Sequence, residues 1–175
     1  MSENHKAKAS YLDYVSSVPV NIEGMIRAFD IELDKNSNLK EGVLGEICKI
    51  GEKYKISIQR KDHYYRKRFT MAHELGHYLF HRDKIGDGID DAEGYVSLYR
   101  KADCVGSDEE AEANSFAAGI LMPKNLVLEY AKDRGVYNSS GAIDQDAVKE
   151  IATAFQVSVA AMTITIKKLK SELTN

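Results

Sequence analysis

The 175-residue sequence predicts an α+β fold that is mainly helical and contains a small antiparallel sheet. Helical spacing of apolar residues recurs along much of the chain, and two short runs rich in β-branched residues flank Gly51-Glu52-Lys53, as in a hairpin. Two further helical patterns near the C-terminus are separated by three residues, which is the spacing of a helix-turn-helix unit. We expect a main domain over residues 1–138 and a helix-turn-helix-like helical subdomain packed on it over residues 139–175.

The first part of the chain predicts two helices, a short strand and the hairpin. Pro19 interrupts the first helix, and Asn21 is a suitable N-cap for the second. The expected elements are helices over 9–18 and 22–29, strands over 31–33, 43–50 and 54–58, and a polar loop over 34–42.

The rest of the chain predicts five helices and one long loop. Asp62 is a plausible cap for the first of these helices, and Pro123 both ends the second and opens the third. Gly135 and Ser158 have the residue types that favour helix ends and helix starts, respectively. The expected helices cover about 65–81, 107–122, 124–134, 143–155 and 159–173, and the loop covers 82–106 with one possible strand over 95–99.

The helix over 65–81 carries the motif His73-Glu74-x-x-His77. On a helix of 3.6 residues per turn the two histidines share one face, so both imidazoles can bind one metal ion. Glu74 projects from a neighbouring strip, where it can act on a water molecule as a base. This pattern predicts a zinc site. Gly76 costs about 1 kcal/mol relative to Ala in a helix, which suggests the close approach of another backbone or a ligand.

A catalytic zinc site normally has three protein ligands, so a third donor is expected elsewhere. Asp83 stands six residues after His77, where a metzincin has its third histidine, and excludes that arrangement. Glu110 lies in an acidic run of a later helix, on one face with Asn114, which could orient its carboxylate. Glu110 also completes the pattern Ser107-x-x-Glu110, in which a glutamate only caps the helix. The neighbouring Glu109 and Glu112 lie off that face and are expected to be solvated.

Composition excludes several other classes of protein. The net charge of −3 gives no field suited to a polyanion, and Cys48 and Cys104 form neither a CxxC pair nor a disulfide framework. No stretch has the length of a membrane span, and the N-terminal residues lack the apolar core of a signal peptide. We therefore expect a cytoplasmic protein without membrane contact.

The C-terminal helix pair also permits a DNA-binding regulator, which belongs to a different functional class. The helix that would read DNA begins with the residues 159–165, Val-Ala-Ala-Met-Thr-Ile-Thr, which include none of the Arg, Lys, Asn or Gln side chains that read base edges. Lys167, Lys168 and Lys170 come only at its far end and suit phosphate contacts at most. Direct nucleic-acid binding is therefore expected to be absent, and a packing or partner-docking role is favoured.

Two stretches of the sequence closely resemble the ImmA/IrrE family of metallo-endopeptidases. They are the segment from Arg68 to His77, with the sequence RFTMAHELGH, and the segment from Glu110 to Pro123, with the sequence EAEANSFAAGILMP. Residues 19–22 and 29–31 are similar to the start of that domain. The resemblance implies a small zincin fold with His73, His77 and Glu110 as zinc ligands and Glu74 as the catalytic carboxylate. Thr165 stands near a position where such chains usually have an arginine.

The resemblance also implies a substrate. Members of this family act on a partner repressor of the Xre helix-turn-helix type, and its cleavage derepresses mobile-element or stress genes. The alternative is an inactive zinc-binding scaffold that sequesters the repressor.

Two features of the proposed peptidase stay open. The oxyanion donor is unassigned among His63, Tyr64, Tyr78, His81 and Tyr95, with His81 favoured as a helix-end or supporting residue. A strand edge beside the metal helix is a hypothetical binding site for an extended substrate.

Overall fold

The computed structural model describes residues 14–86, 108–137 and 141–173. Its main helices are α2 (Ile22–Ala28), α3 (Tyr64–Phe80), α4 (Asp108–Leu121), α5 (Lys124–Asp133), α6 (Gln145–Phe155), α7 (Val159–Lys168) and α8 (Lys170–Leu173). Its strands are β1 (Ile31–Ser37), β2 (Gly45–Ile50) and β3 (Lys53–Gln59), and a short 3₁₀ helix, η1, covers Arg82–Lys84. The α+β class is confirmed.

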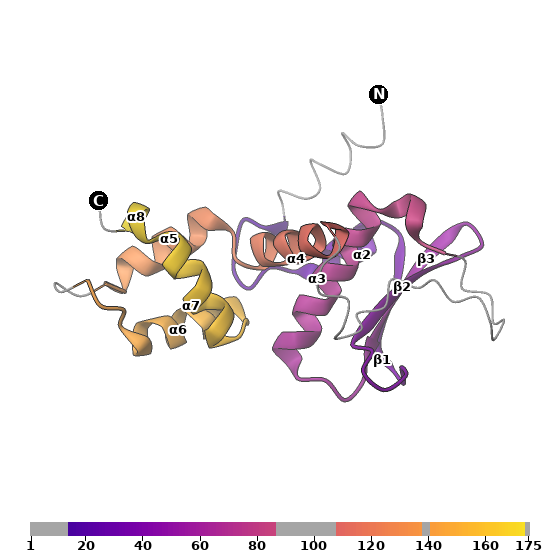
Figure 1. Ribbon diagram of the computed structural model, residues 1–175, viewed down its shortest axis with the longest axis horizontal. Helices are drawn as coiled ribbons and strands as arrows, with labels where there is room; N and C mark the ends of the chain where they lie inside the picture. Colours follow the sequence, from indigo (N-terminus) through magenta and orange to yellow (C-terminus); the bar gives the residue numbers. More distant parts are fainter. Residues whose placement is uncertain (1–13, 87–107, 138–140, 174–175) are drawn as a thin grey trace, which may run out of the picture.

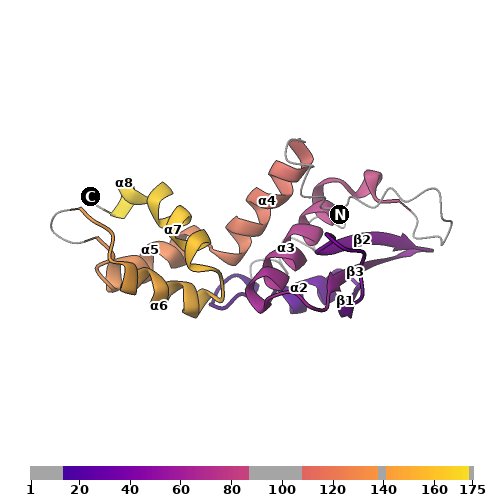
Figure 2. The ribbon, with the colours of Figure 1, turned by 60° about the horizontal axis from the view of Figure 1, so that its bottom comes forward.

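The elements form two groups along the long axis of the molecule (Figures 1 and 2). The sheet and helices α2 to α4 make up one group, and helices α5 to α8 make up the other. The strand predicted over 95–99, including Tyr95, and the candidate cap Ser107 lie outside the described residues, as do residues 9–13 of the helix predicted over 9–18. Tyr14 is helical and residues 15–18 form a bend, so that helix ends earlier than predicted.

The sheet is mixed, with the strand order β1-β3-β2. The predicted hairpin is confirmed, because β2 and β3 pair antiparallel through partners such as Ile47 and Ile56. The prediction of a wholly antiparallel sheet was wrong, because β1 pairs parallel with β3. The connection over 38–44 carries the chain past the position of β3, and the tight hairpin then returns β3 between the other two strands.

Strand β1 is longer than the three residues predicted for it. It continues to Ser37 through a register irregularity after Asp34, so the polar stretch predicted to be a loop is partly strand. Its polar composition reflects its place at the edge of the sheet, where backbone pairing with β3 holds the strand and side chains face solvent.

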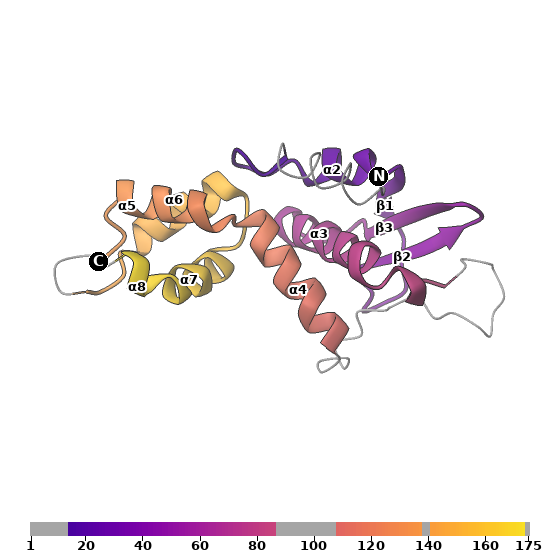
Figure 3. The same ribbon diagram turned by 90° about the horizontal axis from the view of Figure 1, so that it is seen from above.

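Helix α3 lies at the centre of the first group (Figure 3). It packs on β2 and β3, against α2 and against α4, and nearly every residue from Arg68 to Tyr78 is buried. The helix begins at Tyr64, and its cap is His63, whose Nδ1 accepts from the amide of Tyr65 at 3.3 Å. The predicted cap, Asp62, instead accepts from the amide of His63 and from the side chain of Arg66. Helix α3 also binds the backbone that precedes α2, because the buried Arg68 guanidinium donates to the carbonyl of Val20 at 2.8 Å.

The second group contains the predicted helix-turn-helix geometry. Gln156 adopts a left-handed conformation at the end of α6, and the Ser158 hydroxyl caps α7 by accepting from the amide of Ala161 at 3.1 Å. The final helix is broken after Lys168, so α8 is a separate short helix. Helix α5, which precedes the predicted boundary at residue 138, packs against α6 and α8. The boundary itself stays a prediction.

The second group makes side-chain hydrogen bonds to residues outside it. The Tyr64 hydroxyl donates to Oε1 of Gln156 at 2.8 Å, and the Thr165 hydroxyl contacts the Met122 sulfur at 3.4 Å. Across the described part of the chain, no single helix has the length and apolarity needed to cross a membrane, although α6 and α7 meet that test if combined across a bend of 109°.

Candidate metal centre

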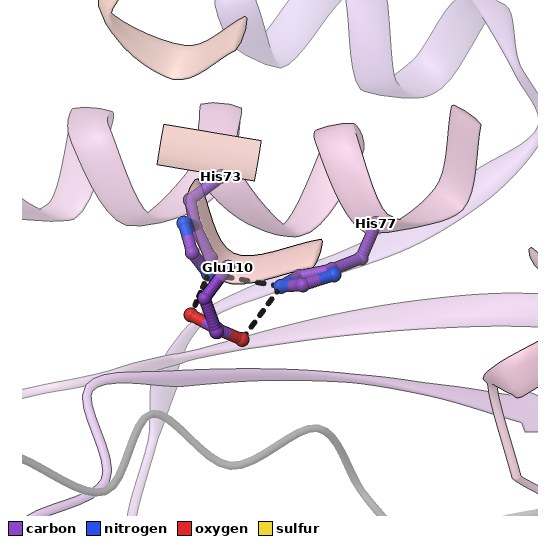
Figure 4. A group of neighbouring side chains, drawn as sticks. All are labelled: His73, His77 and Glu110. Atoms are coloured by element: carbon purple, nitrogen blue, oxygen red, sulfur yellow. Dashed lines mark hydrogen bonds and ion pairs between the residues drawn. The ribbon is translucent and has the colours of Figure 1, made fainter. Parts of the chain in front are cut away.

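The two histidines of α3 point at a common place. His73 and His77 are both buried, and their Nε2 atoms lie 3.0 Å apart because the side chains leave the same face of the helix one turn apart. Figure 4 shows both imidazoles directed toward a third side chain, Glu110. The motif therefore has the geometry that its spacing predicts.

Glu110 reaches both imidazoles from α4. Its Oε2 lies 3.3 Å from Nε2 of His73, and its Oε1 lies 3.1 Å from Nε2 of His77. The carboxylate is buried, with 9% of the residue exposed. The cap predicted from Ser107 involves a residue outside the described part of the chain, whereas the contacts with His73 and His77 place the Glu110 side chain at the histidine pair.

The three donors fit a small divalent metal ion. Their ligand atoms lie within 4.8 Å of one another. In a tetrahedral site with bonds of 2.0–2.1 Å, neighbouring donor atoms are about 3.3 Å apart. The two imidazole nitrogens lie 3.0 Å apart, close to that value, and each lies within 3.3 Å of one oxygen of the Glu110 carboxylate. Two imidazoles and one carboxylate also leave one tetrahedral position open, as in catalytic zinc sites.

Gly76 allows the two helices to come this close. A Cβ atom at Gly76 would lie 3.2 Å from the Cα of Ala113 and 3.1 Å from the Phe116 ring. The expectation that another backbone approaches this glycine is confirmed. His73 within α3 contacts Asn114, whereas Lys84, just after α3, contacts Glu109 at the start of α4, so α3 and α4 pack antiparallel.

Asn114 contacts a histidine. Its Oδ1 lies 3.1 Å from Nδ1 of His73, whereas the sequence suggested that it would orient the Glu110 carboxylate. If Nδ1 of His73 donates this hydrogen bond, the ring keeps its proton there and presents the lone pair of Nε2 toward Glu110. Asn114 thereby supports a candidate metal ligand, and its predicted role toward the Glu110 carboxylate stays a prediction.

Glu74 lies beside the start of β2. Its side chain is fully buried, and a Cβ atom at Gly45 would lie 3.2 Å from Glu74 Oε1 and 2.3 Å from Thr70 Cγ2. Only a glycine fits at this point, because any side chain would collide with α3. The backbone of the edge strand thus passes directly over the carboxylate that follows the first histidine.

The candidate oxyanion donors are spread along α3. His63 and Tyr64 lie at its N-terminal end, about 15 Å along the helix axis from His73. Tyr78 packs edge-to-face against Phe29 and Tyr54. His81 lies next to His77, and Tyr95 is outside the described residues. The arrangement assigns none of them as the donor.

Two acidic residues expected to be solvated have partners. Glu109 pairs with Lys84, and that ammonium group lowers the pKa of the Glu109 carboxyl to about 2. Glu112 lies 3.2 Å from Nε2 of His81 although most of its side chain is exposed. The helical face predicted for Glu109 and Glu112 could not reveal either contact, because Lys84 and His81 lie beyond the last turn of α3 and reach α4 from there.

The family model for the IrrE N-terminal-like domain, Peptidase_M78, matches residues 30–167. A search of curated proteins finds no match to the chain. The matched range contains the whole donor set, so the family supports a metallopeptidase-type function and the buried cluster could hold a metal ion. The chain belongs to the family of IrrE N-terminal-like domains, Peptidase_M78.

Proposed function

We propose that this protein is a zinc-dependent endopeptidase that cleaves a partner transcriptional repressor of the Xre helix-turn-helix type. The observation that carries the proposal is the convergence of His73, His77 and Glu110, with Glu74 one residue along the same helix. The family match supports the peptidase class, and the resemblance to ImmA/IrrE proteins supports the choice of substrate.

The donor set favours zinc. Two imidazole nitrogens and one carboxylate oxygen are common ligands of catalytic zinc, whereas magnesium and calcium prefer oxygen ligands throughout. When bound, zinc supplies Lewis acidity, which polarises a carbonyl group and allows water to react near neutral pH. His73, His77 and Glu110 would hold the ion.

Glu74 is the proposed general base and acid. Its carboxylate accepts a proton from the attacking water and then passes that proton to the leaving amine nitrogen of the substrate. It suits this role because it is held on a rigid helix beside the metal ligands, in a buried position. General acid–base catalysis of this kind contributes about 10²–10⁴-fold to a rate.

The edge strand β2 gives an extended substrate a place beside Glu74. The amide of Lys49 donates to the carbonyl of Gly86 at 3.0 Å, which shows that the backbone of Lys49 faces the outer edge of the sheet. Backbone direction alternates along a strand, so Gly45 and Ile47 face the same way. A peptide that pairs with these two residues would run past the carboxylate.

Cleavage of the repressor is tested with Glu74→Gln, which keeps the shape of the side chain and removes its basicity. The zinc-loaded full-length chain is incubated with an Xre-type repressor, and fragments are identified by mass spectrometry. We expect the wild type to cut, and Glu74→Gln to bind equal zinc and cut about 10²–10⁴-fold more slowly. Glu150→Gln, the same substitution at an exposed position of α6, is the matched control.

Two outcomes would overturn parts of the proposal. Undiminished cleavage by Glu74→Gln would remove Glu74 from the mechanism. Zinc and repressor binding by the wild type without any fragments would favour the inactive scaffold that sequesters the repressor.

A further inference from the structure

The metal ligand His77 is held by a second histidine. Its Nδ1, on the side of the ring opposite the donor cluster, lies 3.1 Å from Nδ1 of His81. His81 is the C-cap of α3, and its residue is buried even though the helix has ended. Its other nitrogen, Nε2, lies 3.2 Å from Oε2 of Glu112 on α4.

Only one arrangement of protons lets these contacts and a metal at His77 coexist. A metal on Nε2 of His77 requires the ring proton on Nδ1, which then donates to Nδ1 of His81. His81 must accept on Nδ1 and so carries its own proton on Nε2. That proton is directed at the Glu112 carboxylate, which is an acceptor.

We propose that His81 and Glu112 are positioning residues that fix the tautomer and the ring orientation of His77 for metal binding. This inference rests on the metal site of the proposed function. The second ring N–H of a ligating histidine usually donates a hydrogen bond to a carboxylate, a carbonyl or water, and these partners raise metal affinity. Here the Glu112 carboxylate does not contact His77 directly but acts on it through the imidazole of His81.

The two histidine ligands are supported differently by the same helix. Asn114 contacts His73 with a neutral amide, whereas Glu112 acts on His77 through His81. Helix α4 therefore supplies the third ligand and the outer support of both histidines. Asn114 and Glu112 flank Ala113, which lies against Gly76 where the two helices meet.

Glu112 offers the cleanest test because its side chain is 58% exposed and its removal leaves no buried cavity. The affinity of the full-length chain for Zn²⁺ is measured by competition with a chromophoric chelator. We expect Glu112→Ala to weaken binding about tenfold and Glu112→Gln, which keeps an acceptor oxygen, to weaken it less. Glu109→Ala removes the same charge one turn earlier from a pair with Lys84, and its zinc affinity should match the wild type.

His81→Phe keeps a ring in the buried site and removes both nitrogens. It should weaken zinc binding about 10–100-fold. A spectroscopic measurement separates positioning from a purely structural role. Long-range ¹H–¹⁵N spectra of the zinc-loaded wild type should show His81 in one tautomer, protonated on Nε2, and Glu112→Ala should give a mixture of tautomers.

The outcomes separate this inference from the proposed function. Equal zinc affinity in wild type, Glu112→Ala and His81→Phe would overturn the positioning role and leave the metal centre standing. A His81 tautomer that does not change in Glu112→Ala would overturn it as well. A wild-type chain that binds no zinc would overturn both proposals.

Discussion

The two groups of elements, the sheet with α2 to α4 and the helices α5 to α8, differ in the side chains that they bury. Helices α6 and α7 pack through apolar side chains alone, such as Ile151, Phe155 and Met162. Helices α3 and α4 bury three ionisable metal-ligand candidates between them, and α3 also buries Glu74. Burying such groups costs free energy unless they are paired or bind a metal. The group that contains α3 and α4 therefore buries the candidate metal ligands in addition to its own apolar core.

Phe155→Ala should give the largest effect on stability. Its side chain is fully buried and packs edge-to-face on Tyr130. Removing it should lower the free energy of unfolding by about 3–5 kcal/mol, measured by urea denaturation. Zinc stoichiometry of the folded protein should stay unchanged. Loss of zinc in this variant would show that the metal centre depends on the packing of the group α5 to α8.

Zinc itself should stabilise the chain, and Glu110→Ala should abolish that gain. Free zinc at 100 times its dissociation constant stabilises a folded protein by about 2.7 kcal/mol when the unfolded chain does not bind it. The measurement is the unfolding free energy with and without zinc. Glu150→Gln should show the full gain, and an equal gain in Glu110→Ala would remove this residue from the donor set.

Two glycines in helices provide a matched pair. Gly76 lies against the backbone of Ala113, whereas a Cβ atom at Gly119 of α4 would meet nothing within 4 Å. Gly119→Ala should stabilise the protein by up to about 1 kcal/mol through helix propensity. At Gly76 the same change adds about 1–3 kcal/mol of overpacking, which should cancel or exceed that gain and weaken zinc binding by separating the helices. Equal stabilisation by both changes would show that the helices do not need Gly76.

The smallest effect concerns acid pH. The folded-state pKa of Glu109 is about 2, below its ordinary value of 4.5, because Lys84 donates to the carboxylate. This pair therefore stabilises the folded chain above pH 4.5, and the contribution disappears as the pH falls toward 2. Lys84→Met should flatten the loss of unfolding free energy between pH 5 and pH 3. The change is small because the pair is exposed. An unchanged slope would rule out the pair as its source.

Local patterns predicted the parts of the molecule that depend on nearby residues. The geometry of His73 and His77 follows from a spacing of four, and Gly76 was exceptional because a helix rarely tolerates it without a reason. The hairpin and the cap at Ser158 are equally local. The family match accords with the resemblance carried by the same motifs.

Contacts between distant segments were harder to predict. The parallel pairing of β1 depends on where the hairpin returns, which no residue of β1 encodes. The partner of Asn114 and the pairing of Glu112 with His81 depend on how α4 crosses α3. Helical phase places Glu112 away from Glu110, and only the antiparallel packing brings it to the end of α3.

The zinc K-edge X-ray absorption spectrum of the full-length chain, loaded with one equivalent of zinc, tests the two-helix metal centre most directly. We expect two imidazoles and a first shell of nitrogen and oxygen at about 2.0–2.1 Å. A sulfur shell at about 2.3 Å, or a spectrum without two imidazoles, would contradict it.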